Sequence, residues 1–192
     1  VDAALLHGTS LESPVFRTVL GLWKQTNPTS DEQRACLSCH VPSVTIFPQH
    51  AEKIVGDVLA GKPRVEGIGC AACHLMNGID GSAKSHPSFT VQPGKTLYGP
   101  YSNPEENLVH LAVQSDHFRE VSFCASCHFD KVKDVIQKDL PGEILQGTVC
   151  QDCHMEPSTG SSTSRRGAMT RPIGRHWFRG VVGSGTLLRN RN

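Results

Sequence analysis

The chain has few of the residues from which an ordinary globular core is built. Only 38% of its 192 residues are hydrophobic and 6% are aromatic, while 18 glycines and 12 prolines interrupt it throughout. A core made of side chains alone would be thin for this length, because a domain of this size normally buries most of its apolar surface. We therefore expect another source of buried apolar surface.

Long apolar runs and an excess of charge are also missing. No apolar run approaches the roughly 20 residues that a helix needs to cross a bilayer, so we expect no transmembrane segment. The formal net charge of +1 argues against nucleic acid as a main partner. The sequence begins at Val1 without an initiator methionine or a signal-like segment, and we expect a mature exported protein whose signal peptide has been removed.

Cysteine is the residue with the clearest pattern. All eight cysteines form C-x-x-C pairs, and a histidine follows each pair at once. The pairs are Cys36/Cys39, Cys70/Cys73, Cys124/Cys127 and Cys150/Cys153, and the histidines that follow them are His40, His74, His128 and His154.

Zinc sites, disulfides and thioredoxin-like motifs are alternative uses of paired cysteines, but none of them needs a histidine after the second cysteine. Since 10 of the 192 residues are histidine, the chance of finding one after all four pairs is about 10⁻⁵. The C-x-x-C-H unit is the attachment site of a c-type haem, in which both thiols bond to the haem and the histidine binds its iron. We predict four covalent haem c groups, attached outside the cytoplasm.

Four such haems leave four axial iron positions for other ligands. Any single histidine is more often a solvated side chain, but six further histidines are present here against only three methionines. The candidates are His7, His86, His110, His117 and His176, followed by His50, whose place at a helix start is common for solvated histidines. Bis-His ligation closes both axial positions, so it predicts electron transfer and not chemistry on a substrate.

Two helices are expected in the first third of the chain. Thr9 or Ser13 can cap a helix that begins near Pro14. Residues 50–61 predict a short amphipathic helix that ends at Gly61. Its inward residues would be Ile54, Val55, Val58 and Leu59.

Residues 102–118 give the strongest helix signal. Asn103 can cap the helix, Pro104 suits its first turn, and two glutamates complement its dipole. An unbroken helix would place His110 and His117 on one face, about 10.5 Å apart along its axis. We expect at least one of them to reach an iron.

The composition changes after residue 155. Residues 156–192 contain seven arginines and no acidic residue beyond Glu156. A disordered basic tail is one interpretation. The other is an extension that carries His176 and docks on its own or a neighbouring subunit, its arginines pairing with haem propionates or with that subunit. We therefore divide the chain into a tetrahaem domain, 1–155, and an extension, 156–192. The expected fold is mainly α with much irregular loop and little sheet, organised around four stacked covalent haems.

Several segments together resemble the multihaem superfamily of tetrahaem cytochrome c-554 and, more distantly, of hydroxylamine oxidoreductase and pentahaem nitrite reductase. They occur in family order over most of residues 5–180. The segments are LLHGTSLESPVF, ACLSCHVP, VEGIGCAACH, YGPY, FCASCH, CQDCHM and HWFRG.

The resemblance also implies axial ligands. By analogy, His7 binds the iron of the His74 haem, His176 that of the His128 haem, and His117 or His110 that of the His40 haem. Family members usually carry another C-x-x-C-H before the segment that matches LLHG, which is missing here, whereas CQDCH appears at the other end. The residue matching His86 binds that missing haem, so we expect His86 to ligate a haem of a neighbouring copy, most simply that on His154.

A head-to-tail contact of this kind builds a filament. In this respect the chain resembles the filament-forming extracellular cytochromes of the outer-membrane cytochrome E type and their archaeal counterparts. This implies a subunit of a nanowire at or outside the cell surface, with itself, other multihaem cytochromes or extracellular electron acceptors as partners. The alternatives are a discrete periplasmic tetrahaem shuttle, with all axial bonds made within one chain, and a multihaem reductase, which needs a five-coordinate haem.

Overall fold

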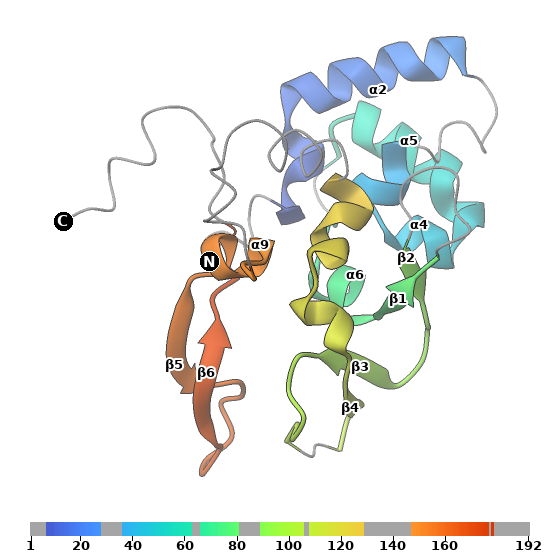
Figure 1. Cartoon of the computed structure of the whole chain (residues 1–192). Helices are drawn as coiled ribbons and strands as arrows, with labels where there is room; N and C mark the ends of the chain where they lie inside the picture. Colours follow the sequence, from blue (N-terminus) through green and yellow to red (C-terminus); the bar gives the residue numbers. More distant parts are fainter. Residues whose placement is uncertain are drawn as a thin grey trace.

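The computed structural model describes residues 7–27, 36–62, 66–80, 89–105, 108–128, 147–176 and 178. About 46% of these residues are helical, and the strands form three separate two-stranded sheets. The expected mainly helical class is thus confirmed for this part of the chain, although the strands are more numerous than the sequence suggests. Short helices gather at one end of the molecule and the strands at the other (Figure 1). No described helix is long and apolar enough to cross a membrane.

The N-terminal helices begin and end largely where the sequence predicts. Helix α2 (Pro14–Thr26) has proline at its first position, and the Ser13 hydroxyl accepts a hydrogen bond from a backbone N–H of the first turn at 3.4 Å. Helix α5 (Ala51–Leu59) ends shortly before Gly61, whose φ of 66° suits glycine. The other helical elements here are η1 (Ser10–Glu12), residues 36–40, α4 (Ser43–Ile46) and η2 (Pro48–His50).

These helices enclose the main hydrophobic core, with α2 lying over α5 (Figure 1). Val55 and Val58 of α5 point inward as predicted, but Leu59 is 38% exposed. Leu59 occupies the last position of α5 and lies over Gly21, which has no side chain to cover it. The core consists of Leu11, Leu20, Leu37, Val41, Val44, Ala51, Val55 and Val58.

Leu20 gives a direct test of this core because none of its surface is exposed. Replacing Leu20 by alanine should reduce the free energy of unfolding of this unit by about 2–5 kcal/mol, through lost burial and the cavity left behind. Guanidinium titration of the haem-loaded protein, followed by the circular dichroism of the helices, measures the loss. The matched control is Val15→Ala, because Val15 lies on α2 and is 72% exposed. This substitution should change the free energy of unfolding by less than about 0.5 kcal/mol. Equal effects of the two variants would contradict the assigned core.

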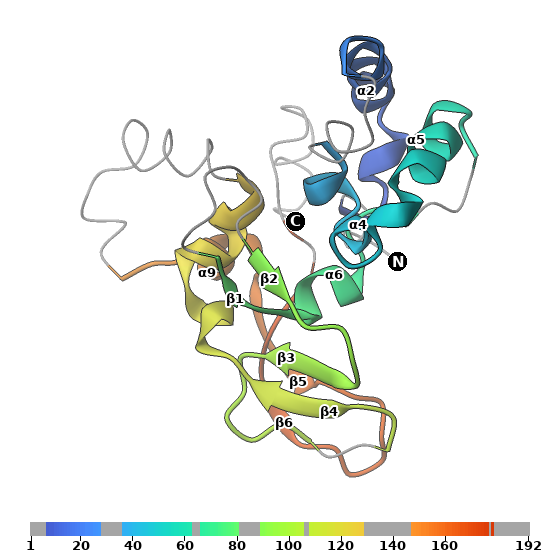
Figure 2. The same ribbon diagram turned by 90° about the vertical axis from the view of Figure 1, so that its right-hand side faces the viewer.

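Three short sheets follow the second motif. Strands β1 (Met76–Ile79) and β2 (Phe89–Val91) pair antiparallel with a bulge, and β3 (Thr96–Gly99) pairs parallel with β4 (Leu111–Gln114). The C-terminal hairpin consists of β5 (Pro157–Ser161) and β6 (Thr170–Gly174). Figure 2 shows β3 and β4 side by side and β5–β6 as a separate hairpin. The helical elements of this half are α6 (Cys70–His74), η3 (Asp116–Arg119), residues 121–128 and α9 (Cys150–His154).

The predicted helix over 102–118 is wrong. Residues 111–114 form β4, which pairs with β3. Backbone hydrogen bonds hold its two ends, from Leu111 N–H to Lys95 O at 2.7 Å and from Ser115 N–H to Gly99 O at 2.8 Å. Residues such as Leu, Ala, Val and Gln occur in helices and in strands, and this pairing overrides the cap and dipole signals of the segment. His110 precedes β4 and His117 lies in η3, so the two do not share a helix face.

The hairpin β5–β6 is fastened to residues 101–105. Arg171 on β6 is only 7% exposed, and its guanidinium lies 4.5 Å from the centre of the Tyr101 ring. It also donates to the backbone oxygen of Asn103 at 3.0 Å, while the Tyr101 hydroxyl donates to the carbonyl of Pro172 at 2.9 Å. The part of the extension that is described is therefore an ordered hairpin, and its end is held in place two residues before His176.

Candidate haem centres

Each C-x-x-C-H motif lies on helical turns. The second and fourth motifs form α6 and α9, the first occupies residues 36–40, and the third ends the helix at 121–128. In a helix, residues three and four apart share a face, so the two cysteines and the histidine of each motif can contact the same ligand. All eight cysteines are free thiols. This local structure is what covalent attachment of a haem requires of the motif.

Three of the motifs meet through their thiols. Cys39 of the first motif and Cys127 of the third lie close enough to shift each other's pKa, and so do Cys124 of the third and Cys150 of the fourth. The Cys124 contact, opposed in part by burial, lowers the pKa of Cys150 to about 6. Burial and the neighbouring Cys70 raise the pKa of Cys73, in the second motif, to about 11.

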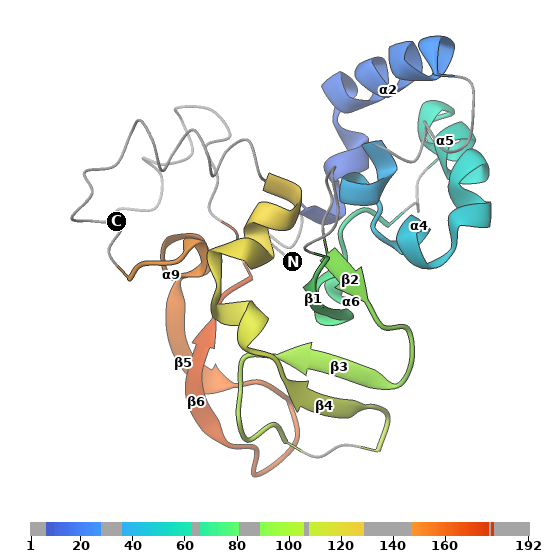
Figure 3. The same cartoon turned by 45° about the vertical axis from the view of Figure 1, so that its right-hand side comes forward.

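The third motif is the centre of this arrangement. Besides their neighbours in the first and fourth motifs, its thiols interact electrostatically with Cys73 of the second. Burial and the third-motif histidine, His128, lower the pKa of His40, and burial and His154 lower the pKa of His128. In Figure 3 the helix at 121–128, drawn in yellow, is seen between α6 and α9. The order of the motifs in space therefore differs from their order in the sequence.

Two non-motif histidines stand opposite motif histidines. The ring centres of His7 and His128 are 6.0 Å apart with an interplanar angle of 88°, and those of His176 and His74 are 6.2 Å apart with an angle of 38°. One metal ion bound between two imidazoles by bonds of roughly 2 Å places the ring centres about 6 Å apart. Both pairs thus fit the two axial ligands of one haem iron.

The same pairs are electrostatically linked. The pKa of His7 is lowered by burial and by His128, and that of His176 by its partial burial and by His74. A lowered pKa favours the neutral imidazole, which is the form that binds a metal. The donor set therefore fits a bis-His haem at both places.

The pairing differs from the one that the resemblance implied. That analogy gives His7 to the His74 haem and His176 to the His128 haem, whereas the ring contacts in the structure are between His7 and His128 and between His176 and His74. The backbone of His7 does lie beside the second motif, because its carbonyl accepts a hydrogen bond from Ile68 N–H at 3.1 Å. Its ring, however, reaches over to the third motif.

His117 has the environment of a metal ligand. It is 7% exposed, and its Nε2 is buried without a hydrogen-bond partner. Its Nδ1 lies 3.5 Å from Glu120 Oε2 and 3.5 Å from Ser122 Oγ, and this serine donates to the same carboxylate oxygen at 2.7 Å. The bonds from Ser122 and then from His117 lower the pKa of Glu120. A ligating histidine usually presents one nitrogen to the metal and has the other fixed in this way.

His74 shows a related pattern, since its Nδ1 lies 2.6 Å from the backbone oxygen of Tyr98 on β3. Phe118 stacks on the His74 ring at 5.4 Å, and Phe118 and Phe123 are 4.6 Å apart. Phe123 in turn meets the His117 ring at 5.2 Å. Aromatic rings thus fill the space between two candidate ligands and restrict their movement.

The remaining predicted ligands are more scattered. His40 stacks on Phe16 at 4.1 Å and has a buried Nδ1 without a partner. His110 is half-buried just before β4, and His50 is exposed beside Phe47 at 5.9 Å. His86 lies outside the described residues.

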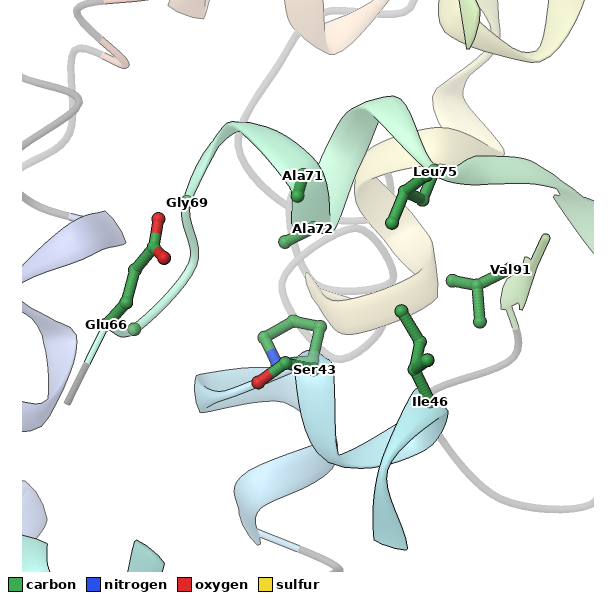
Figure 4. Close-up of a pocket in the computed structure, with 10 residues that line it drawn as sticks. Ser43, Ile46, Glu66, Gly69, Ala71, Ala72, Leu75 and Val91 are labelled. Atoms are coloured by element: carbon green, nitrogen blue, oxygen red, sulfur yellow. The ribbon is translucent and has the colours of Figure 1, made fainter. Parts of the chain in front are cut away.

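The described side chains show no clustered metal site, and the pocket between α4 and α6 is small. Within the described ranges, no group of three or more His, Cys, Asp or Glu side chains could hold a metal ion, so the histidines are arranged as pairs and not as a four-ligand cluster. A pocket between α4 and α6, lined among others by Ile46, Ala72 and Leu75, has a volume of about 60 Å³ (Figure 4). Typical ligand sites measure about 300–1,000 Å³, so we assign it no substrate.

Several site residues were not found by sequence reasoning. Glu120, Ser122 and the aromatic residues near the histidines carry no sequence motif that marks them. Phe178 lies 4.5 Å from the His7 ring and 6.0 Å from the His176 ring, so it touches candidate ligands of two haems. Phe178 lies in the segment HWFRG, but that segment predicted a role only for its histidine, His176.

Comparison with known families gives one match. The family model described as "Cytochrome c554 and c-prime" matches residues 17–75. This stretch contains the first two C-x-x-C-H motifs. The match supports a cytochrome of the c554-like family, covalently bound haem c and electron transfer, and cytochromes of this kind are typically exported. No curated protein and no solved structure matches the chain.

Proposed function

We propose that the chain is a tetrahaem electron carrier, in which each C-x-x-C-H motif holds one haem c. The observation that carries this proposal is the pair of ring separations, 6.0 Å for His7 and His128 and 6.2 Å for His176 and His74. A solvated histidine has no reason to face a motif histidine at the distance set by one shared metal. When bound, the haem irons supply reversible one-electron chemistry.

The protein's own residues hold the ligands and exclude other reactions. Cys36, Cys39, Cys70, Cys73, Cys124, Cys127, Cys150 and Cys153 would form the thioether bonds, and His40, His74, His128 and His154 would bind the irons from the motif side. Histidines on both sides of an iron leave no open position for a substrate. Aromatic neighbours and the bonds at Nδ1 fix the rings of half-buried His74 and buried His117. This supports an electron carrier over a reductase.

The convergence of the motifs supports transfer between the haems within one chain. Since the third motif contacts the first and fourth through its thiols, and lies beside the second, its haem would be the junction of the four. The spatial order thus favours a connected group of four haems over four isolated sites.

The finer proposal is that the chain is the subunit of an extracellular filament. Six non-motif histidines are available for four axial positions, which leaves ligands to spare for a neighbouring copy. An apolar ridge supports such a contact, because Leu108, Val109 and Leu111 are 106%, 83% and 65% exposed beside His110. His86 remains our proposed crossing ligand, and other multihaem cytochromes or extracellular acceptors remain the proposed partners.

Haem content and assembly state test these proposals together. The ratio of haem to protein and the intact mass should give four covalent haems per chain, and fewer would overturn the tetrahaem proposal. Electron microscopy of the native, untreated protein should show filaments. His86→Ala should shorten or abolish them, while His50→Ala, a surface control, should not. A monodisperse single chain with four low-spin haems would make the protein a discrete shuttle and would rule out the filament.

A further inference from the structure

A carboxylate lies beside the second ring nitrogen of His117. Of the candidate ligands, His74 donates its second ring nitrogen to a neutral backbone carbonyl, and His7 and His40 have a buried Nδ1 with no partner. His117 differs from these because Nδ1 faces the Glu120 carboxylate and the Ser122 hydroxyl, each at 3.5 Å. A chain whose haems share one kind of ligation needs such second contacts if its haems are to differ.

The two side chains act as a unit. Ser122 Oγ donates to Glu120 Oε2 at 2.7 Å, which points the carboxylate oxygen toward the imidazole. Glu120 ends the turn of η3 that carries His117, and its backbone N–H bonds to His117 O at 3.2 Å. Glu120 is therefore tied to the backbone of His117 through its own N–H and to the imidazole through its carboxylate. Nε2, on the opposite side of the ring, is buried and free to bind a metal.

We propose that Glu120, oriented by Ser122, is a positioning residue that holds the His117 ring and lowers the reduction potential of the haem that His117 ligates. The inference rests on the proposed function, in which His117 is an axial ligand. A negative charge at Nδ1 makes the imidazole a stronger electron donor and stabilises the oxidised iron. Neutral partners, such as the Tyr98 carbonyl at His74, provide no such charge. Glu120 thereby makes the reduction potential of one haem differ from those of the others.

The test uses the haem-loaded full chain and three variants. Glu120→Gln keeps the shape and removes the charge, Ser122→Ala removes the orienting hydroxyl, and Asp116→Asn removes a carboxylate of the same turn that bonds to Gln114 and not to His117. Redox titrations followed by low-temperature electron paramagnetic resonance resolve the individual haems. We expect E120Q to raise one potential only, increasing the ratio of reduced to oxidised haem at that site about fivefold at a fixed solution potential. Its low-spin signal should shift as well.

The remaining variants distinguish the role of Glu120 from the role of His117 as a haem ligand. S122A should produce a smaller shift of the same haem, and D116N should leave all four potentials in place. His117→Ala should turn one haem high-spin; if it does not, His117 is no ligand and the proposed role of this histidine fails. If H117A does so while E120Q leaves every potential and signal unchanged, the role of Glu120 is refuted. Equal shifts in E120Q and D116N would reduce it to a general effect of surface charge.

Discussion

Replacing His7 by alanine should convert one low-spin haem to a high-spin, five-coordinate form, and replacing His176 should do the same to a different haem. Each variant should lose about a quarter of the low-spin signal, since one of four haems loses an axial ligand. The affected haem should bind cyanide or added imidazole, which the intact protein excludes. Its reduction potential should rise because the ferric state loses a donor.

The interplanar angles make the two variants distinguishable. The rings of His7 and His128 are nearly perpendicular, at 88°, whereas those of His176 and His74 are inclined by 38°. Perpendicular axial imidazoles leave two iron d orbitals nearly equal in energy and give a highly anisotropic resonance, while more nearly parallel rings give an ordinary rhombic one. H7A should therefore remove an anisotropic signal and H176A a rhombic signal.

His50 supplies the matched control. It is exposed at the start of α5 and contacts Phe47 at 5.9 Å, so His50→Ala should leave every signal unchanged. The pairing with motif histidines is checked by the double variant His7→Ala with His128→Met, which should affect one haem and not two. Loss of two haem signals in that variant would show that His7 ligates a different iron from His128, as the family resemblance implies.

The sequence was most informative where chemistry depends on spacing. The C-x-x-C-H units, the capped start of α2 and the amphipathic α5 all follow from contacts between residues three or four apart. Each could be predicted because the interacting residues are neighbours in the chain. The histidines that pair with the motifs are far from them in sequence, and no local pattern encodes which ring meets which.

The errors also have a physical origin. Residues 102–118 carry helix signals, but β3 offers a backbone edge that only the folded chain provides, and Leu111 to Gln114 pair with it. The ring contacts of His7 and His176, which differ from those that the resemblance implies, have a similar origin. Backbone contacts put His7 beside the second motif, and a rotation of its side chain decides which iron it reaches. Analogy follows backbone order and does not resolve such a choice.

Removing all eight cysteines by alanine substitution, so that no haem can be attached, should unfold the C-terminal half of the described chain. Hydrogen exchange should show residues 96–176 losing at least about a hundredfold in protection. Helices α2 and α5 should keep part of theirs. We expect this division because the buried apolar side chains are unevenly distributed.

The reason lies in what each half buries. The N-terminal unit packs eight apolar residues into one cluster, and each buried leucine or valine contributes about 1.5–3 kcal/mol. Beyond Phe89, the buried residues among those described are polar: His117, Ser126 and Arg171. Ordering a residue costs about 1–2 kcal/mol of backbone entropy, and hydrogen bonds at the surface do not offset that over three small sheets.

The haems would supply the missing apolar surface, because the motif helices 121–128 and α9 meet through thiols and not through a packed core. Adding Leu20→Ala to the cysteine-free chain should then melt α2 and α5 as well, since their shared core is the remaining source of stability. Unchanged protection of 96–176 without haem would show that its side chains suffice. In that case the scarcity of apolar residues would need another cause than bound cofactors.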